Sequence, residues 1–284
     1  MSQEQTLQST FLDIEEGLKG GTLGVAATFL PTAESVFFNA DMEFPTASVI
    51  KIAIVTEVFL QVESGDLSPK SLIEIPETAF VPGSGVLAQL TPGLTLPLGD
   101  LATLTINVSD NTASNLCLAA VGGPGVVNAR MQNVWGMKNT TIHRPIKFAL
   151  EPGDPRYTAT STPRDMQALV QHLGEATLIP QAVCDQVLRR MGYVVDGELL
   201  PRYLDVNPYA ADQRLEAPPF VVRHKGGAVN GVRADAGLIS RGDEVLAVCV
   251  FTKDVPDSRW TSTNLGSEAV ARVGEALCQH FFKR

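Results

Sequence analysis

The chain has 284 residues, of which 44% are hydrophobic and 19% charged, and its formal net charge at pH 7 is −9. This composition predicts a sizeable buried core and argues against long disordered stretches. Without a basic field, neither nucleic acid nor a membrane surface is an expected partner. We see no membrane-spanning segment and no signal-peptide pattern, which predicts either a cytoplasmic protein or one trimmed of its leader.

In chain order, the pattern predicts strands and a helix at each end of the chain with helices between them. A long apolar helix is expected over residues 48–62, and the sequence stays helical and loop-rich to about residue 168. The terminal segments are predicted as helices over 5–18 and 267–282 and as strands over 23–30, 35–39, 220–224, 236–239 and 245–252.

This order of elements favours an α/β protein of the α+β type. Its antiparallel sheet would be built from both termini and flanked by the terminal helices, with an all-helical lobe inserted. We expect a single domain over residues 1–284, with an α/β lobe at 1–45 plus 215–284 and a helical lobe at 46–214. A monomer is the expected oligomeric state.

The four cysteines are predicted to be small core residues. None belongs to a CxxC pair or a Cys/His cluster, so we expect no zinc site, no other metal and no cofactor. Spacing alone leaves a disulfide open. The cysteines are Cys117, Cys184, Cys249 and Cys278.

Ser48-Val49-Ile50-Lys51 opens the long apolar helix. Residues three apart share a helix face, so the amine of Lys51 can reach the hydroxyl of Ser48. A serine becomes a nucleophile when a nearby base takes its proton, and a lysine held neutral by burial and by the positive helix end can do so. Such a pattern is expected by chance about once in a chain of this length, so alone it is a weak signal.

Two further motifs follow in the chain. Ser109-Asp110-Asn111 supplies a hydroxyl and an amide, and it also suits the N-terminal cap of a helix. Lys225-Gly226-Gly227 follows the predicted strand 220–224, and its glycines permit either a tight turn or the close approach of a ligand.

Together and in this order, the three motifs resemble the S-x-x-K, S-D-N and K-T-G set of class A β-lactamases and penicillin-binding proteins. The resemblance extends from about Leu23 to the C-terminus. Further stretches that carry it are SDNTASNL (109–116), PGDPR (152–156), TPRDM (162–166) and HKGG through GVR (224–233).

The resemblance implies a serine hydrolase that forms an acyl-enzyme with a small molecule, either a β-lactam, a peptide or an ester. Ser48 would be the nucleophile and Lys51 its base, while Ser109 would pass a proton to the leaving nitrogen. The remaining implied roles are substrate binding by Asn111, Gly226 and Gly227, a positive charge from Lys225, and an oxyanion hole from the backbone N–H groups of Ser48 and Ala228.

The sequence departs from the family pattern at two places. Gly226 replaces the hydroxyl residue that normally binds the substrate carboxylate, and Arg233 and Arg223 are candidates to compensate, with a plain surface role as the alternative for either. Class A enzymes also carry a Glu and, four residues later, an Asn that hold the deacylating water. The loop before the Thr-Pro-Arg segment lacks this pair and offers only Glu151, several residues late, as a possible deacylation base.

Three interpretations remain open. The chain is a β-lactamase-like hydrolase that deacylates slowly, a D-Ala-D-Ala-type peptidase or esterase on the same fold, or a non-catalytic binding module. The presence of both Ser48 and Lys51 favours an enzyme.

Overall fold

A five-stranded antiparallel sheet forms the centre of the protein. In the computed structural model, which describes residues 3–194, 197–209, 213 and 215–282, the strand order is β2-β1-β10-β9-β8. Val25 of the N-terminal part pairs with Val250 of the C-terminal part, so the predicted union of both ends in one sheet is confirmed. The strands are β1 (Thr22–Phe29), β2 (Glu34–Phe38), β8 (Val221–Val229), β9 (Val232–Arg241) and β10 (Glu244–Lys253).

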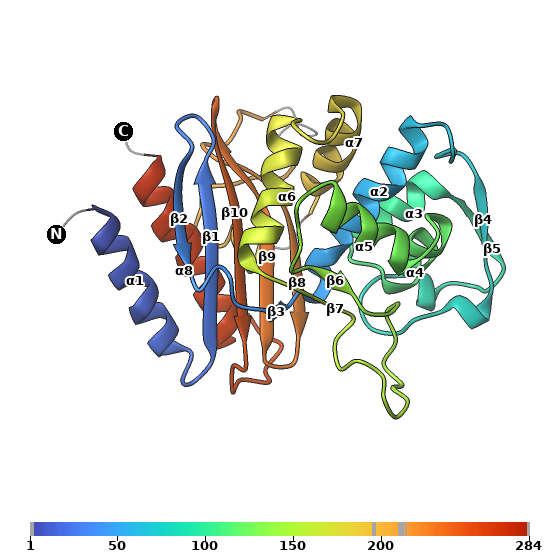
Figure 1. Cartoon of the computed structure of the whole chain (residues 1–284), viewed down its shortest axis with the longest axis horizontal. Helices are drawn as coiled ribbons and strands as arrows, with labels where there is room; N and C mark the ends of the chain where they lie inside the picture. The colour runs from blue at the N-terminus through green and yellow to red at the C-terminus, as the bar shows by residue number, and fades with distance from the viewer. Residues whose placement is uncertain (1–2, 195–196, 210–212, 214, 283–284) are drawn as a thin grey trace.

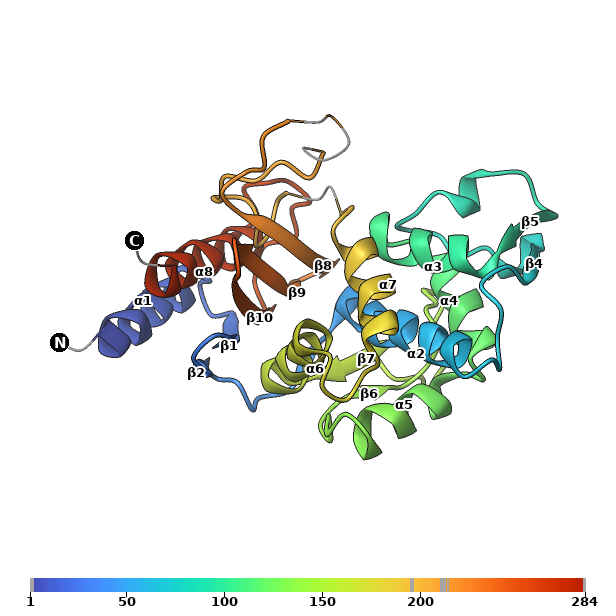
Figure 2. The same ribbon diagram turned by 90° about the horizontal axis from the view of Figure 1, so that it is seen from above.

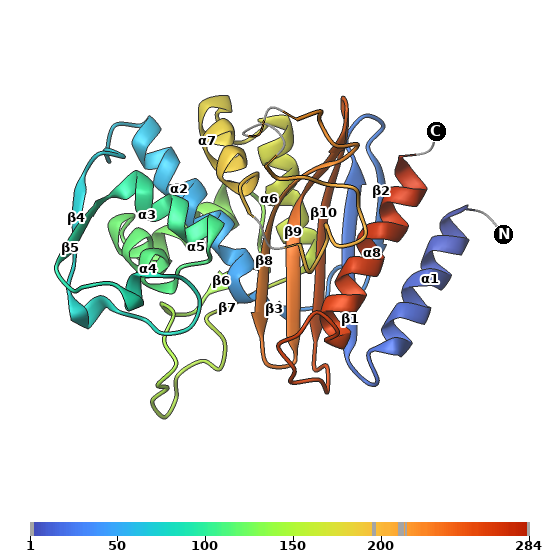
Figure 3. The same cartoon turned by 180° about the vertical axis from the view of Figure 1, so that it is seen from behind.

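The two terminal helices cover one face of this sheet. α1 (Gln3–Gly17) and α8 (Leu265–Phe281) pack against each other, and Figures 1 and 3 show them side by side at the same end of the molecule. Their apolar faces join the sheet in one buried cluster, in which the rings of Phe29 and Phe281 stack at 5.5 Å. The predicted flanking helices are therefore confirmed, with ends within three residues of those expected.

The helix α6 (Pro163–Glu175) covers the opposite face of the sheet (Figure 2). The Thr162 side chain caps it by accepting from Asp165 N, and Pro163 occupies its first turn. Its apolar side packs on β10, β1 and β9. By position in the chain we placed this segment in the helical lobe, but its contacts make it a layer of the α/β lobe.

Helix α2 runs through the middle of the helical lobe, where α3, α4, α5 and α7 contact it (Figure 2). Its residues from Lys51 to Phe59 are all buried, which explains why this stretch is mostly apolar, with Lys51, Thr56 and Glu57 as its polar members. The lobe's helices are α2 (Lys51–Glu63), α3 (Leu98–Asn107), α4 (Asn111–Ala120), α5 (Pro124–Asn133) and α7 (Gln181–Met191).

Several short elements lie outside the prediction because they are too short for a hydrophobic period to show. One small sheet has the order β3-β7-β6, and β4 pairs with β5 as a hairpin at the far end of the helical lobe. Their bounds are β3 (Phe44–Pro45), β4 (Leu72–Ile75), β5 (Leu94–Pro97), β6 (Thr141–Ile142) and β7 (Ala159–Ser161), with 3-10 turns η1 (Ala47–Ile50), η2 (Glu77–Ala79) and η3 (Leu87–Gln89).

The strand before the third motif is longer than predicted. β8 continues to Val229, so Lys225-Gly226-Gly227 lies inside the strand and not beyond its end. Neither glycine forms a turn, and Gly227 makes a close backbone contact that is described below. All four cysteines are buried and free, and within the described ranges no helix is long and apolar enough to cross a membrane.

Candidate active site

A strained turn presents Ser48 at the surface. The extended pair β3 enters η1 through Ala47, whose φ of +44° lies in the left-handed region. Thr46 N donates to Ala159 O over 3.2 Å, which ties the turn to β7. Val49 and Ile50 are buried while Ser48 is partly exposed, so the Ser48 hydroxyl is accessible on a turn that is itself firmly anchored.

Lys51, the first residue of α2, is fully buried beneath this turn. Its Nζ lies 2.6 Å from Ser109 O, 3.2 Å from Ser109 Oγ and 2.9 Å from Asn111 Oδ1. The structure thus brings the first two sequence motifs into direct contact. None of these three hydrogen-bond partners is a carboxylate, the group that would hold the proton of a lysine most strongly.

The charge state of Lys51 follows from this environment. Burial, together with the positive charge of Lys225, holds the pKa of Lys51 well below its usual value, against the opposing attraction of Asp110. A lowered pKa leaves more of the amine neutral at physiological pH. The neutral amine is the form that can accept a proton from Ser48.

The segment Ser109-Asp110-Asn111 is held in an unusual backbone conformation. Ser109 has a φ of +55°, and Asp110 caps α4 by accepting from Ala113 N over 2.9 Å. The capping role and the contact with Lys51 therefore coexist in one turn. The Asn111 amide nitrogen donates to Pro82 O over 2.9 Å, and a primary amide nitrogen carries two N–H groups.

A glycine-flanked loop that we did not single out from the sequence closes over this segment. Ser84 Oγ donates to Ser109 O over 2.7 Å, and Asn111 N donates to Ser84 O over 3.1 Å. Gly83 and Gly85 on either side both have φ near +100°, and a Cβ on Gly85 would overlap Asp110. The Gly-Ser-Gly pattern was the available signal for a tight approach.

Strand β8 brings the third motif against the turn that carries Ser48. A Cβ built on Gly227 would lie 2.6 Å from Ser48 N and 3.1 Å from Thr46 O, so only glycine fits at this contact. The Ser48 amide therefore lies against β8 at Gly227, the residue before Ala228. Lys225 is buried, and its Nζ donates to Gly226 O over 2.6 Å.

A buried hydrogen-bonded pair of side chains supports this strand from the other face of the sheet. His224 Nδ1 lies 2.9 Å from Asp235 Oδ2, and both side chains are almost completely buried between β8, β9 and the loop after α7. The same carboxylate accepts from Leu200 N over 3.1 Å. The pair fixes the strand next to Lys225, but it joins residues eleven apart and gave no local sequence signal.

Arg233 has the contacts of a structural residue. Its guanidinium donates to the carbonyl oxygens of Val229, Val232 and Arg259 and to Ser267 Oγ of α8. These partners lie on the α8 side of the sheet, opposite the face that carries Lys225 and Gly227. We therefore do not assign Arg233 to the substrate carboxylate.

The loop between β6 and β7, which carries Glu151, projects from the body of the molecule (Figures 1 and 3). Glu151 is exposed, and its backbone N–H donates to Asp154 Oδ2 over 2.6 Å. Arg144 holds the base of the loop, since its buried guanidinium donates to carbonyl oxygens on both sides, including Pro145 O and Pro155 O. The loop is thus anchored while its only glutamate faces solvent.

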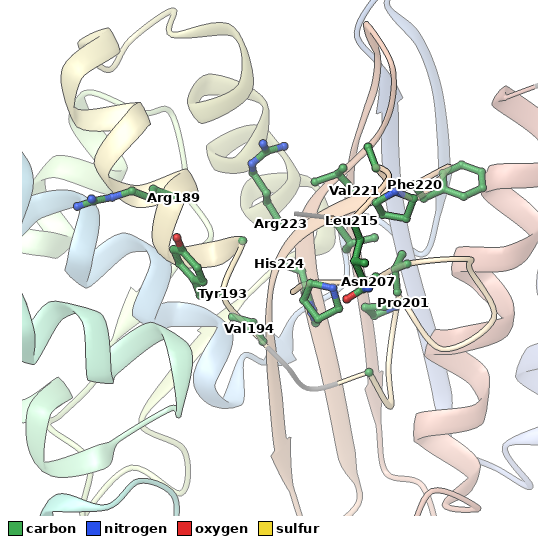
Figure 4. Close-up of a pocket in the computed structure, with 17 residues that line it drawn as sticks. Arg189, Tyr193, Val194, Pro201, Asn207, Leu215, Phe220, Val221, Arg223 and His224 are labelled. Atoms are coloured by element: carbon green, nitrogen blue, oxygen red, sulfur yellow. The ribbon is translucent and has the colours of Figure 1, made fainter. Parts of the chain in front are cut away.

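A separate pocket of about 410 Å³ lies beside the first half of β8 (Figure 4). Arg189 and Tyr193 from the region of α7 and Leu215 and Phe220 from the chain before β8 line it, with His224 at its back. The described lining residues do not include Ser48, Lys51 or Ser109. Over the described ranges, no cluster of His, Cys, Asp and Glu could hold a metal ion.

Comparison with known proteins gives a consistent result. A family model described as "Beta-lactamase enzyme family" matches residues 5–281. A β-lactamase from Sphaerobacter thermophilus has 29% identity and a TM-score of 0.84, with 97% of both chains covered. A mutant of PBP-A, solved as its acyl-enzyme complex with penicillin G, has 26% identity and a TM-score of 0.83, covering 99% of this chain and 97% of the other. The chromosome-encoded β-lactamase of Vibrio parahaemolyticus shares the fold at 22% identity, with a TM-score of 0.83 and coverage of 98% and 100%.

Proposed function

Since the chain belongs to the β-lactamase enzyme family, we propose that it is a penicillin-binding serine hydrolase that is acylated at Ser48 and deacylates slowly. The observation that carries the proposal is the buried Lys51, in contact with Ser109 and Asn111 next to the Ser48 turn. PBP-A, one of its structural relatives, forms an acyl-enzyme with penicillin G in a mutant form.

The residues of this site are sufficient for the acylation step. Neutral Lys51 takes the Ser48 hydroxyl proton as Oγ bonds to the carbonyl carbon of the β-lactam ring. The oxyanion that forms faces the N–H groups of Ser48 and Ala228. The carbon–nitrogen bond then breaks, and the nitrogen receives a proton through the Ser109 hydroxyl, which Lys51 replenishes. The products of this step are an ester on Ser48 and an opened ring.

Substrate binding falls to the groups that surround this centre. The positive charge of Lys225 favours a substrate with a carboxylate, and the second N–H of Asn111 is suited to an amide carbonyl. Gly226 and Gly227 let an extended substrate lie along the backbone of β8, with no hydroxyl from Gly226 to assist.

Deacylation lacks an equivalent base. Hydrolysis of the ester needs a water that is both positioned and deprotonated, and the loop over residues 143–158 has no Glu…Asn pair to do so. A positioned general base contributes about 10²–10⁴ in rate, or roughly 3–5 kcal/mol of barrier. The acyl-enzyme should therefore accumulate.

The test is stopped-flow hydrolysis of the chromogenic cephalosporin nitrocefin, with intact-mass spectrometry after penicillin G. We expect a burst of product equal to the enzyme concentration, a slow steady state and one covalent adduct, with burst and adduct absent in Ser48→Ala. An adduct that persists in Ser48→Ala would refute the assignment of the nucleophile.

Fast, linear nitrocefin turnover with no trapped ester would refute slow deacylation. In that case Glu151→Gln is the next variant, since a collapse of turnover would identify Glu151 as the base. A p-nitrophenyl ester measured in parallel separates the peptidase or esterase alternative, because an esterase would turn it over while nitrocefin gives only the burst.

A further inference from the structure

Ser84 shares both of its side-chain acceptors with Lys51. Its Oγ lies 2.7 Å from Ser109 O and 3.3 Å from Asn111 Oδ1. Lys51 Nζ lies 2.6 Å and 2.9 Å from the same two oxygens. Two donors from distant parts of the chain therefore converge on one pair of acceptors beside the nucleophile.

The loop that carries Ser84 is held tightly although Ser84 itself is exposed. Val86 N and Leu87 N donate to Asp110 Oδ2 over 2.7 Å and 2.8 Å. A Cβ on Gly83 would lie 2.9 Å from Asn111 Nδ2, so the backbone is pressed against the motif before Ser84 as well as after it. The fold thus holds the backbone on both sides of Ser84, and the contacts of its hydroxyl with Ser109 O and Asn111 Oδ1 set the direction of the side chain.

The shared acceptors bear on the protonation of Lys51. A carbonyl oxygen has two lone pairs, and the Ser84 hydroxyl uses one on Ser109 O. Hydrogen bonds to a charged form stabilise that form, so an acceptor shared with a second donor stabilises an ammonium group less than an unshared one. The charged groups that act on Lys51 are Lys225 from β8 and Asp110 at the start of α4, and their effects oppose each other.

We propose that Ser84 is a positioning residue for acylation, whose hydroxyl shares the oxygens of Ser109 and Asn111 and so helps to keep Lys51 as the neutral amine that receives the Ser48 proton. The proposal rests on the proposed function, because it takes Lys51 to be the base. Ser84 touches neither substrate nor the reacting atoms in this scheme and acts through Lys51 and Ser109.

The test compares Ser84→Ala and Ser84→Thr with the wild type. The second-order rate constant for acylation by nitrocefin is measured from pH 5 to pH 9. In Ser84→Ala we expect the rising limb of the profile to move about 0.5–1 unit toward higher pH, from the loss of one hydrogen bond. At pH values below this limb, the acylation rate constant should therefore fall about three- to tenfold, while its plateau value at high pH is nearly retained.

Ser84→Thr keeps a hydroxyl and should restore the wild-type limb. Ser64→Ala removes an exposed hydroxyl at the other end of α2, where it bonds Gln61 O and Asp66, and is the matched control. A limb unchanged in Ser84→Ala, or a lowered plateau with an unmoved limb, would overturn the proposal. A wild type that is never acylated would instead overturn the proposed function.

Discussion

Replacing Gly227 by alanine tests the contact between β8 and the turn formed by Thr46, Ala47 and Ser48. The added Cβ would lie 2.6 Å from Ser48 N, 3.0 Å from Ala47 Cβ and 3.1 Å from Thr46 O. Carbon–nitrogen contacts are ordinarily near 3.5 Å, so the first is about 1 Å too short. Since backbone atoms cannot rotate away, the strand and the turn must separate.

The separation has two measurable costs. Moving the Ala228 amide away from Ser48 weakens one oxyanion donor, and loss of such a donor lowers the acylation rate by about 10²–10³. Overpacking at the contact should lower the free energy of unfolding by about 1–3 kcal/mol. We therefore expect a folded but slowly acylated Gly227→Ala protein.

The assay pairs stopped-flow acylation with urea unfolding, and Gly125→Ala is the control. Gly125 lies in α5, and a Cβ there meets no atom within 4 Å, so stability should hold or rise and acylation should not change. A Gly227→Ala protein that is acylated within about threefold of the wild-type rate would refute the placement of the oxyanion hole between Ser48 and β8.

Three further outcomes are expected. Lys51→Ala should nearly abolish acylation, whereas Lys225→Ala should weaken it less, because a lost base costs about 10²–10⁴ in rate and a binding charge costs less; equal losses would contradict this division. Folding lowers the pKa of Lys51 from 10.5, so the unfolded chain binds more protons between the two pKa values. The stability of the wild type relative to Lys51→Met should then rise with pH across that window, and urea unfolding that gives a pH-independent difference would refute it. Arg144→Ala should lower the free energy of unfolding by about 2–3 kcal/mol and expose its loop to proteases, whereas Arg164→Ala, which removes an exposed ion pair with Asp41 and a cation–π contact with Phe37, should cost about 1 kcal/mol.

The sheet and its flanking helices could be predicted because their signals are local. The segments over 23–30 and 245–252 are apolar, turn-bounded runs, and the helix over 267–282 has a clear apolar face. The motifs at Ser48 and Ser109 were visible for the same reason, since each spans only three or four residues. Their meeting at Lys51 was expected from the family resemblance and not from spacing.

The features that could not be predicted from the sequence depend on contacts between residues far apart in the chain. Ser84 meets Ser109 across 25 positions, and Asp235 meets His224 across a strand pairing. Two adjacent glycines after Lys225 are as suitable for a turn as for a close approach, and only the packing of Gly227 in β8 on the Ser48 turn decides between them. The assignment of α6 to a lobe failed likewise, because position in the chain does not fix which surface a helix covers.

The pairing of β1 with β10 has a consequence for synthesis on the ribosome. The partner of Val25 is Val250, so β1 and β2 remain a lone hairpin until almost the whole chain has emerged. The lobe around α2 lies before β10 in the chain and can form earlier, and β8–β9–β10 closes by local hairpins as soon as β10 emerges. Until the hairpin docks, β10 offers a bare strand edge to other chains, and that interval is when a nascent or refolding molecule is most exposed to aggregation.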